Sequence, residues 1–237
     1  MTGKTRSAAL AVLTIVAAVS ACEHVSETRT ERKTVDLGGA TSAEVRIKMG
    51  AGELEIGGGA QGLMEASFTT NVRRWEPRVD YSVFGGKGRL SVGQRRGGGL
   101  FLGHSKNEWT VRLGGAVPID LEVGLGAGES ALDLRGLDLR SLEIKMGVGE
   151  MKLDLSGPLK RSLRATIDGG VGHGTVVLPR EIGVKVEVDG GIGSVSAHGL
   201  TKTGRGHVYT NDAYGRTDIS LELKIDAGIG SIDLKIL

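Results

Sequence analysis

The sequence predicts an all-β protein, a parallel β-helix, and three observations support this fold class. Aromatic residues make up only 3% of the 237 residues, and there are 40 glycines against 4 prolines. A Gly-x-Gly marker recurs seven times, flanked by alternating apolar residues. Few aromatics and many tight corners are typical of a thin core of stacked aliphatic side chains. No stretch beyond the first 21 residues has the 3.6-residue apolar period of a helix.

The chain begins with the features of an export signal. Two basic residues precede an apolar run over residues 8–19, which is too short to span a bilayer. Val19-Ser20-Ala21-Cys22 then resembles a lipobox, in which the cysteine thiol is alkylated with diacylglycerol. We therefore expect residues 1–21 to be a lipoprotein signal peptide and Cys22 to be the lipidation site. The alternative is an ordinary secretory signal followed by a chance or buried structural cysteine.

Composition excludes several classes of function. Removal of the signal leaves 28 basic and 28 acidic residues, so the mature chain is formally neutral. A general role in nucleic-acid binding needs a strong positive field, so we expect no nucleic-acid partner. Cys22 is the only cysteine, which excludes an internal disulfide and a cysteine-based metal site. We expect no cofactor and no metal.

Residues 22–42 are polar and predict a lipidated tether. Beyond them, each repeat reads as a strand, a tight glycine turn and a second strand. The third, fifth and seventh residues before the first glycine are apolar, as in Ile47, Val45 and Ala43. Four successive markers lie 21, 23 and 21 residues apart, a period that indicates a solenoid. The markers are Gly50/Gly52, Gly86/Gly88, Gly126/Gly128, Gly147/Gly149, Gly170/Gly172, Gly191/Gly193 and Gly228/Gly230.

Two folds use such a unit, a meander of β-hairpins and a β-helix with a glycine corner in each coil. The middle residue of the marker separates them, because a hairpin tip exposes it whereas a corner can turn it inward. It is apolar in six of the seven copies: Ala51, Ala127, Val148, Val171, Ile192 and Ile229. This favours a β-helix of about seven coils. Lys87 departs from the pattern and predicts an irregular coil there. The handedness of the coil stays open.

Several segments resemble a known family. Residues 47–54 (Ile-Lys-Met-Gly-Ala-Gly-Glu-Leu), Trp75-Glu76-Pro77 and residues 86–92 are similar to the toast-rack domain. The later repeats resemble cell-wall-active-antibiotics response proteins and β-helix adhesins. The resemblance implies a β-solenoid in the cell envelope and supplies no catalytic residue. We expect a toast-rack-like N-terminal region over 43–115 and solenoid repeats over 116–237.

Candidate chemical sites are few. Asp168, Asp189 and Asp226 precede glycine markers and could form a calcium-binding ladder, but Asx turns are the favoured reading. Residues on either side of a marker, such as Lys48 and Glu53, are expected to pair across the turn. The histidines show no zinc spacing, and no Ser-His-Asp set can be assembled from local sequence. We expect no enzyme activity.

Several residues and segments are candidate interaction surfaces. Trp75, Tyr81 and Trp109 could stack on sugars, although Tyr81 falls at a core position. The loop at 95–104 combines two arginines with bulky apolar residues, which suggests a cover for the open coil or a contact with a partner or membrane. The insertion at 197–217 is a second candidate surface. The strand pattern runs to Leu237, so this end needs a cover, either that insertion or an end-to-end homodimer.

These expectations point to a non-catalytic lipoprotein of the bacterial cell envelope, lipid-anchored on its periplasmic or surface side. It would be a structural or interaction module in adhesion or the cell-wall stress response. Its partners would be the membrane, through the lipid anchor, and an envelope protein or cell-wall glycan. The alternative is a carbohydrate-binding or carbohydrate-active β-helix. The sequence leaves the choice between inner and outer membrane open.

Overall fold

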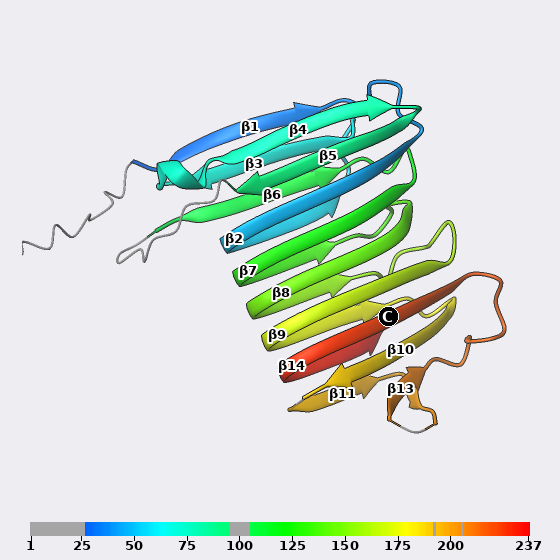
Figure 1. Cartoon of the computed structure of the whole chain (residues 1–237). Helices are drawn as coiled ribbons and strands as arrows, with labels where there is room; N and C mark the ends of the chain where they lie inside the picture. Colours follow the sequence, from blue (N-terminus) through cyan, green and yellow to red (C-terminus); the bar gives the residue numbers. More distant parts are fainter. Residues whose placement is uncertain (1–26, 95–104, 192, 205) are drawn as a thin grey trace, which may run out of the picture.

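The computed structural model describes residues 27–237 except 95–104, 192 and 205 (Figure 1). Within these residues the chain forms fourteen β-strands and one short 3-10 turn, η1 (Arg73–Trp75). The strands are β1 (Arg29–Val35), β2 (Ser42–Gly58), β3 (Met64–Thr70), β4 (Pro77–Phe84), β5 (Lys87–Gln94), β6 (Asn107–Leu113), β7 (Ile119–Asp133), β8 (Leu139–Asp154), β9 (Leu163–Leu178), β10 (Gly183–Gly190), β11 (Ser194–His198), β12 (Thr201–Lys202), β13 (His207–Thr210) and β14 (Ser220–Ile236).

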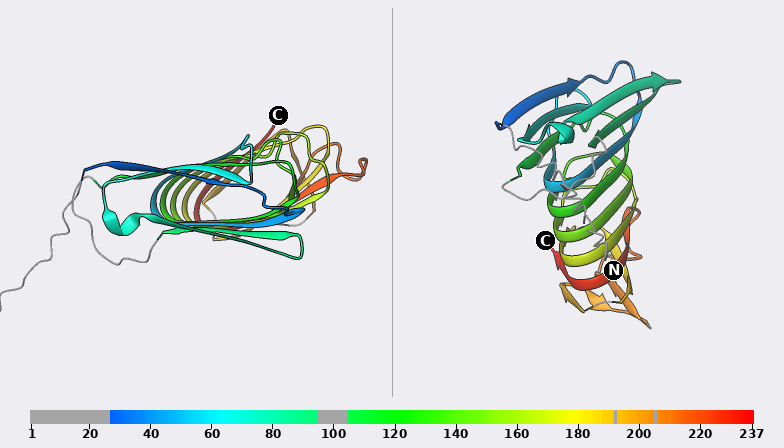
Figure 2. Two further views of the ribbon diagram at one scale, coloured as in Figure 1. Left: turned by 90° about the horizontal axis from the view of Figure 1, so that it is seen from above. Right: turned by 60° about the vertical axis from the view of Figure 1, so that its left-hand side comes forward.

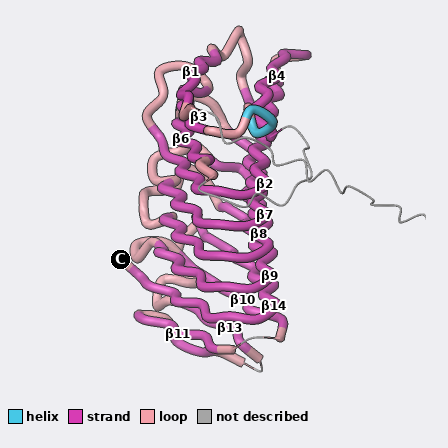
Figure 3. Tube along the Cα trace, turned by 90° about the vertical axis from the view of Figure 1, so that its left-hand side faces the viewer, coloured by secondary structure: helices cyan, strands magenta, loops and turns pink. Residues whose placement is uncertain are grey.

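The molecule is an all-β solenoid, as the sequence predicts. Five long strands, β2, β7, β8, β9 and β14, pair in parallel and keep the same register through their glycine markers. Each strand bends at its marker, so its two halves belong to two opposing sheet faces (Figures 1 and 2). We call the face made by the first halves face A and the other face B. Figure 3 shows the coils stacked along one axis.

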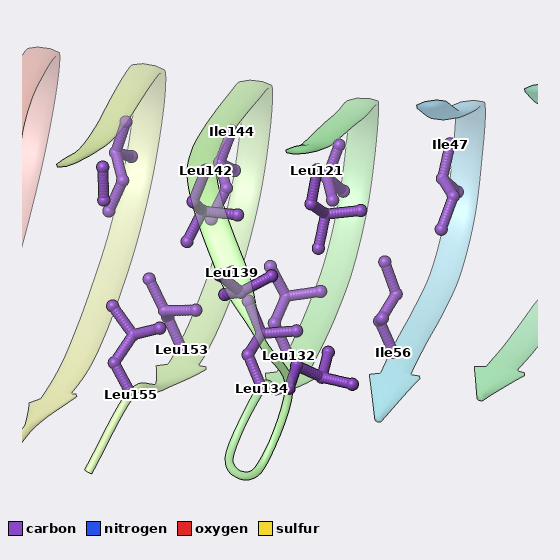
Figure 4. Packing of buried hydrophobic residues seen from close by; sticks show 14 of the residues in the cluster. Ile47, Ile56, Leu121, Leu132, Leu134, Leu139, Leu142, Ile144, Leu153 and Leu155 are labelled. Atoms are coloured by element: carbon purple, nitrogen blue, oxygen red, sulfur yellow. The ribbon is translucent and has the colours of Figure 1, made fainter. Parts of the chain in front are cut away.

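Aliphatic ladders fill the space between the two faces. On face A, Ile47, Val123 and Ile144 occupy matching positions on adjacent strands and are buried. On face B, Ile56 stacks with Leu132 and Leu153 in the same way (Figure 4). Each buried side chain therefore packs against its counterpart in the next coil. The core is thin and needs no large rings, which explains the low aromatic content.

The corner requires glycine because successive coils approach closely there. A Cβ atom on Gly126 would overlap the carbonyl oxygen of Gly50, and one on Gly147 would overlap that of Gly126. The second glycine of the marker has the same restriction and a positive φ as well, +136° at Gly52 and +141° at Gly149. A side chain at either position would force the coils apart. The corner glycines of successive coils therefore stack directly on one another.

The direction of the middle residue was predicted wrongly. Val148 is 55% exposed and Ile229 is 66% exposed, so both point outward from the corner. The buried corner positions are instead those just before the first glycine, such as Met49 and Leu125. The sharp bend interrupts the inside-outside alternation and places the middle residue on the convex side. The β-solenoid was thus predicted correctly, but this argument for it was incorrect.

The corner at Gly191 and Gly193 is built differently from the other corners. β10 ends at Gly190 and β11 begins at Ser194, so Gly191 and Gly193 lie between two separate strands and not within one bent strand. Gly190 has a positive φ of +119°, and a Cβ atom on Gly193 would lie 2.7 Å from the Gly230 carbonyl oxygen. The Gly193 N–H donates to the same carbonyl oxygen at 3.0 Å. The physical reason is that β11 pairs only with β14 among the described strands, so this corner is held by a coil on one side alone.

Two further segments differ from expectation. The marker at Gly86/Gly88 is not a corner, because Gly85 and Gly86 form the two-residue turn of the β4–β5 hairpin, with φ of +56° and +76°. The expected tether at 22–42 contains an ordered strand, β1, which pairs with β3 from Arg29 onward. Its alternation was hidden because β1 is an edge strand with charged side chains even at its inward positions.

The C-terminal strand is covered, but in an order that the sequence does not reveal. β14 lies between β9 on one side and β10 with β11 on the other, all in parallel. The insertion supplies β13, which pairs with β10, and β12, which pairs with β13. The last strand of the sequence is therefore internal to the sheet. Earlier segments of the same chain close this end of the solenoid.

Candidate functional site

The outer side of the glycine corner is the most regular surface of the described residues. Ala51, Ala127, Val148 and Ile229 occupy the middle position on β2, β7, β8 and β14, and Val171 holds it on β9. The side chains of Val148 and Ile229 are exposed. We call these positions the corner ridge. Exposed apolar side chains that lie together, as at Ala127 and Val148 on adjacent strands, are a feature of interaction surfaces.

A row of carboxylates borders the ridge on face B. Glu108, Glu53, Glu129 and Glu150 occupy matching positions on β6, β2, β7 and β8, and we call them the glutamate row. Adjacent strands lie about 4.8 Å apart, and like charges directly opposite one another destabilise a sheet. Only Glu108 has an ion-pair partner among the described residues, with Lys106 at 2.8 Å. The row therefore presents a concentrated negative charge to solvent.

The next positions along this row form a hydrogen-bonded cluster that sequence reasoning missed. The His173 Nδ1 atom lies 2.7 Å from the Ser231 hydroxyl, and its Nε2 atom lies 3.6 Å from an Asp233 carboxylate oxygen. The residues are about sixty positions apart in sequence, so no local motif announces them. All three lie on the outer surface of face B, and the cluster ties β9 to β14. It lies on a sheet surface whose backbone is engaged in strand pairing.

The three candidate calcium-binding aspartates do lie in register, in the order Asp168, Asp226, Asp189. Lys224 neutralises two of them, with its Nζ atom 3.2 Å from Asp226 and 3.8 Å from Asp189. The hydrogen bond with Asp226 raises the pKa of Lys224. Asp189 and Asp226 therefore make ion pairs with Lys224 on face A rather than the expected Asx turns. The described residues contain no group of side chains suited to hold a metal ion.

The expected pairs across the glycine turn are also absent. Lys48 pairs with Glu122 at 2.8 Å instead of Glu53, and Lys145 pairs with Glu143 at 2.5 Å. The hydrogen bond from Lys48 lowers the pKa of Glu122. The reason is geometric: residues flanking a corner point out from opposite faces, whereas those flanking a hairpin tip face each other. The charges on face A therefore pair along and between its own strands.

The tryptophans proposed for sugar stacking are buried. Trp109 packs edge-on against Phe68 with ring centroids 5.1 Å apart, and its indole N–H donates to the Asn107 side chain at 3.0 Å. Trp75, the last residue of η1, is also buried. Tyr81 is half-buried, as predicted, and donates to the Leu37 carbonyl at 2.6 Å, while burial raises its pKa. The exposed aromatic ring of the N-terminal region is Phe84, at 86%.

Two hollows accompany these surfaces. A half-open hollow of about 60 Å³ lies at the corner of β9 and β14. It arises because Gly169 and Gly174 stand where β8 carries Met146 and Met151. A shallow concavity of about 550 Å³ on face B is lined by mixed charges, including Glu55, Arg112 and Lys152. The hollow at β9 and β14 is also lined by His173 and Ser231, two members of the hydrogen-bonded cluster described above.

Other predicted sites lie outside the described residues. These are Cys22, the signal peptide and the loop at 95–104. Of the insertion at 197–217, Tyr209 is buried against β10 and Tyr214 is partly exposed. Among the described residues, no helix is long and apolar enough to cross a membrane.

Fold and surfaces together define a β-solenoid whose outer faces and corner are available for contact. The chain belongs to the toast-rack family, since residues 24–177 match the model for the N-terminal domain of toast_rack. No curated protein matches it. A crystal structure of a candidate cell adhesion protein from Clostridium sporogenes is 33% identical, superposes with a TM-score of 0.82, and covers 89% of this chain and 100% of that chain. A candidate adhesin from Bacteroides fragilis is 12% identical, covers 88% of this chain and 97% of that chain, and has a TM-score of 0.28, too low to support an argument.

Proposed function

We propose that this chain is a lipid-anchored, non-catalytic interaction protein of the bacterial cell envelope that acts in adhesion or the cell-wall stress response. Cys22 carries the anchor, and the solenoid presents the corner ridge and glutamate row to a partner. The observation that carries the proposal is the solenoid fold shared with the Clostridium sporogenes protein over almost the whole chain. Its description as a candidate cell adhesion protein gives the direction of the inference.

Surface chemistry supports a binding role. The corner ridge places the exposed side chain of Val148 beside the glutamate row, and Ile229 extends the apolar ridge beyond it on β14. Such a surface suits a protein partner with an apolar contact and basic flanks, because charge complementarity speeds and orients association. The carbohydrate alternative has less support, since Trp75 and Trp109 are committed to the core. An envelope protein is therefore the favoured partner.

Complementation of a deletion strain tests this function. Three forms are compared with the wild type: Cys22→Ser, the double change Val148→Asp with Ile229→Asp, and the control Lys202→Glu at the far end. We expect the first two to reduce surface attachment or resistance to cell-wall antibiotics, and the control to be neutral. Thermal melting must show that the ridge variant is folded. Wild-type behaviour of both test variants at equal abundance would contradict the proposal.

A further inference from the structure

The N-terminal end of the solenoid carries an excess of basic side chains. Its outermost strands are β1 on face B and β4 on face A, with η1 following β3 (Figure 1). In these elements, Lys33 pairs with Glu31 at 2.5 Å and Arg78 pairs with Asp80 at 2.8 Å. The uncompensated cations are then Arg29, Arg32 and Arg73, all exposed. Arg29 pairs with Thr70, three residues before Arg73, so these two lie at one end of the β1–β3 pair. Arg32 pairs with Ser67 in the middle of β1, where its side chain points to the opposite face of the strand from Arg29.

The N-terminal end of the solenoid also exposes an apolar side chain. Phe84 closes β4 at the tip of the β4–β5 hairpin, at the opposite edge of this end from η1, and is 86% exposed, and the neighbouring Val83 is 38% exposed (Figure 1). Both lie in the outermost strand of face A, so no further strand of the described chain covers them. Basic side chains together with an exposed aromatic residue are the usual composition of a surface that binds the interface of a membrane.

The distance to the expected anchor restricts what can approach this end. Only seven residues separate Cys22 from Arg29, so they can reach about 25 Å when fully extended. Face B contains nine strands from β1 to β11, and at about 4.8 Å per step the solenoid extends roughly 40 Å. A lipid on Cys22 therefore holds the β1 end near the bilayer, while the β11 end can point away from it.

Charge distinguishes an upright from a flat arrangement. If the corner side of face B lay on the membrane, the glutamate row would meet the anionic headgroups at Glu53, Glu129 and Glu150. That contact is repulsive, whereas contact through Arg29, Arg32 and Arg73 is attractive. The two surfaces are roughly perpendicular, since the row runs along the solenoid axis and β1 lies at its end.

We propose that the end formed by β1, η1 and β4 docks on the anionic phospholipid surface of the membrane that carries the Cys22 anchor, so that the solenoid stands upright. This inference rests on the proposed lipidation of Cys22 for its geometry. The docking surface adds a second, electrostatic contact to the lipid. Each basic side chain near an anionic surface strengthens binding about fivefold. The corner ridge and glutamate row are then held perpendicular to the bilayer, where a partner can reach them.

Vesicle flotation tests docking without the anchor. The mature chain carrying Cys22→Ser is mixed with vesicles of phosphatidylglycerol and phosphatidylcholine at low salt. We expect binding that weakens with added salt and falls at least tenfold in Arg29→Glu with Arg32→Glu. The matched control, Lys202→Glu with Lys235→Glu, makes the same change in net charge at the other end and should bind as before. No binding to anionic vesicles, or equal loss in both double variants, overturns the docking surface.

Orientation is measured on the lipidated protein in the same vesicles. A fluorophore is placed at Ser82→Cys on β4 or at Lys202→Cys on β12, and energy transfer to a headgroup acceptor is recorded. We expect strong energy transfer from position 82 and weak transfer from position 202. The transfer from position 82 should fall when Arg29→Glu and Arg32→Glu are added. Equal transfer from both positions contradicts the upright arrangement. As a control, the chain with no added cysteine is treated with the same fluorophore. If it becomes labelled, Cys22 has a free thiol and the anchor is refuted, whereas the flotation result still decides docking.

Discussion

At the scale of single residues, the corner glycines are required by the neighbouring coil as much as by their own turn. Gly149 has a φ of +141°, which disfavours a side chain, and its absent Cβ atom leaves room for the carbonyl oxygen of Gly128. The same contact recurs between Gly172 and Gly149. A substitution at one corner therefore disturbs two coils.

Two glycine-to-alanine changes separate this requirement from ordinary glycine flexibility. Gly149→Ala should lower the free energy of unfolding by about 3 kcal/mol or more, because the methyl group collides with backbone at a positive φ. Gly174→Ala should raise it by about 0.5–1 kcal/mol. Gly174 has no positive φ, and its Cβ atom would meet the Met151 methyl group at 3.8 Å, beside the hollow at the corner of β9 and β14. Urea unfolding of both variants measures the two effects, and similar losses in both would contradict the stacked corner.

At the scale of elements, the position of β14 links the end of the sequence to the stability of earlier strands. β10 and β11 pair in parallel with β14, and β13 reaches the sheet through β10. β9, the preceding coil, pairs with β14 rather than with β10. The segment from β10 to β13 therefore lacks its native neighbour until the last strand has been added.

Removal of residues 220–237 tests this dependence. We expect the truncated chain to lose amide-exchange protection over residues 183–210 as well, while the coils formed by β2, β7 and β8 keep theirs. The physical reason is that unpaired strand edges and an open aliphatic core cannot remain folded in water. Hydrogen exchange with mass spectrometry resolves the two regions. Retained protection over 183–198 would mean that β10 can pair directly with β9 and that β14 is dispensable.

Much of this architecture could be predicted from the sequence because local alternation and the glycine period carry it. The buried ladder through Ile47 and Ile144 follows directly from the spacing of apolar residues. The outward direction of the Val148 side chain could not be predicted, since the bend at the corner interrupts the alternation of buried and exposed residues. The order of β14 and β10 and the contact of His173 with Ser231 depend on pairings between distant segments. No local pattern specifies those pairings.

The marker at Gly191/Gly193 shows the same limit of local sequence. It has the spacing of the other markers, yet β10 ends at Gly190, which has a positive φ, and β11 begins only at Ser194. Gly193 could not be told apart from Gly172 by its neighbours in the sequence. What differs is the coil on its far side, because β9 is flanked by β8 and β14 whereas β11 pairs with β14 alone among the described strands.

At the scale of the whole molecule, the solenoid has two different ends and one distinctive edge. The β1 end is rich in basic residues, whereas the β14 end is closed by β10 and β11. The corner edge carries apolar side chains next to the glutamate row. A lipid at Cys22 would orient these features relative to the bilayer, so the function proposed for every other surface depends on that modification.

The mass of the mature N-terminal peptide tests this central claim most directly. The protein is purified from membranes of its native host, digested, and the peptide that begins the mature chain is identified by mass spectrometry. The account predicts a peptide that starts at Cys22, lacks residues 1–21, and carries the added mass of a diacylglyceryl group with its acyl chains. A peptide that starts elsewhere, or one with an unmodified Cys22 thiol, would contradict the lipid anchor.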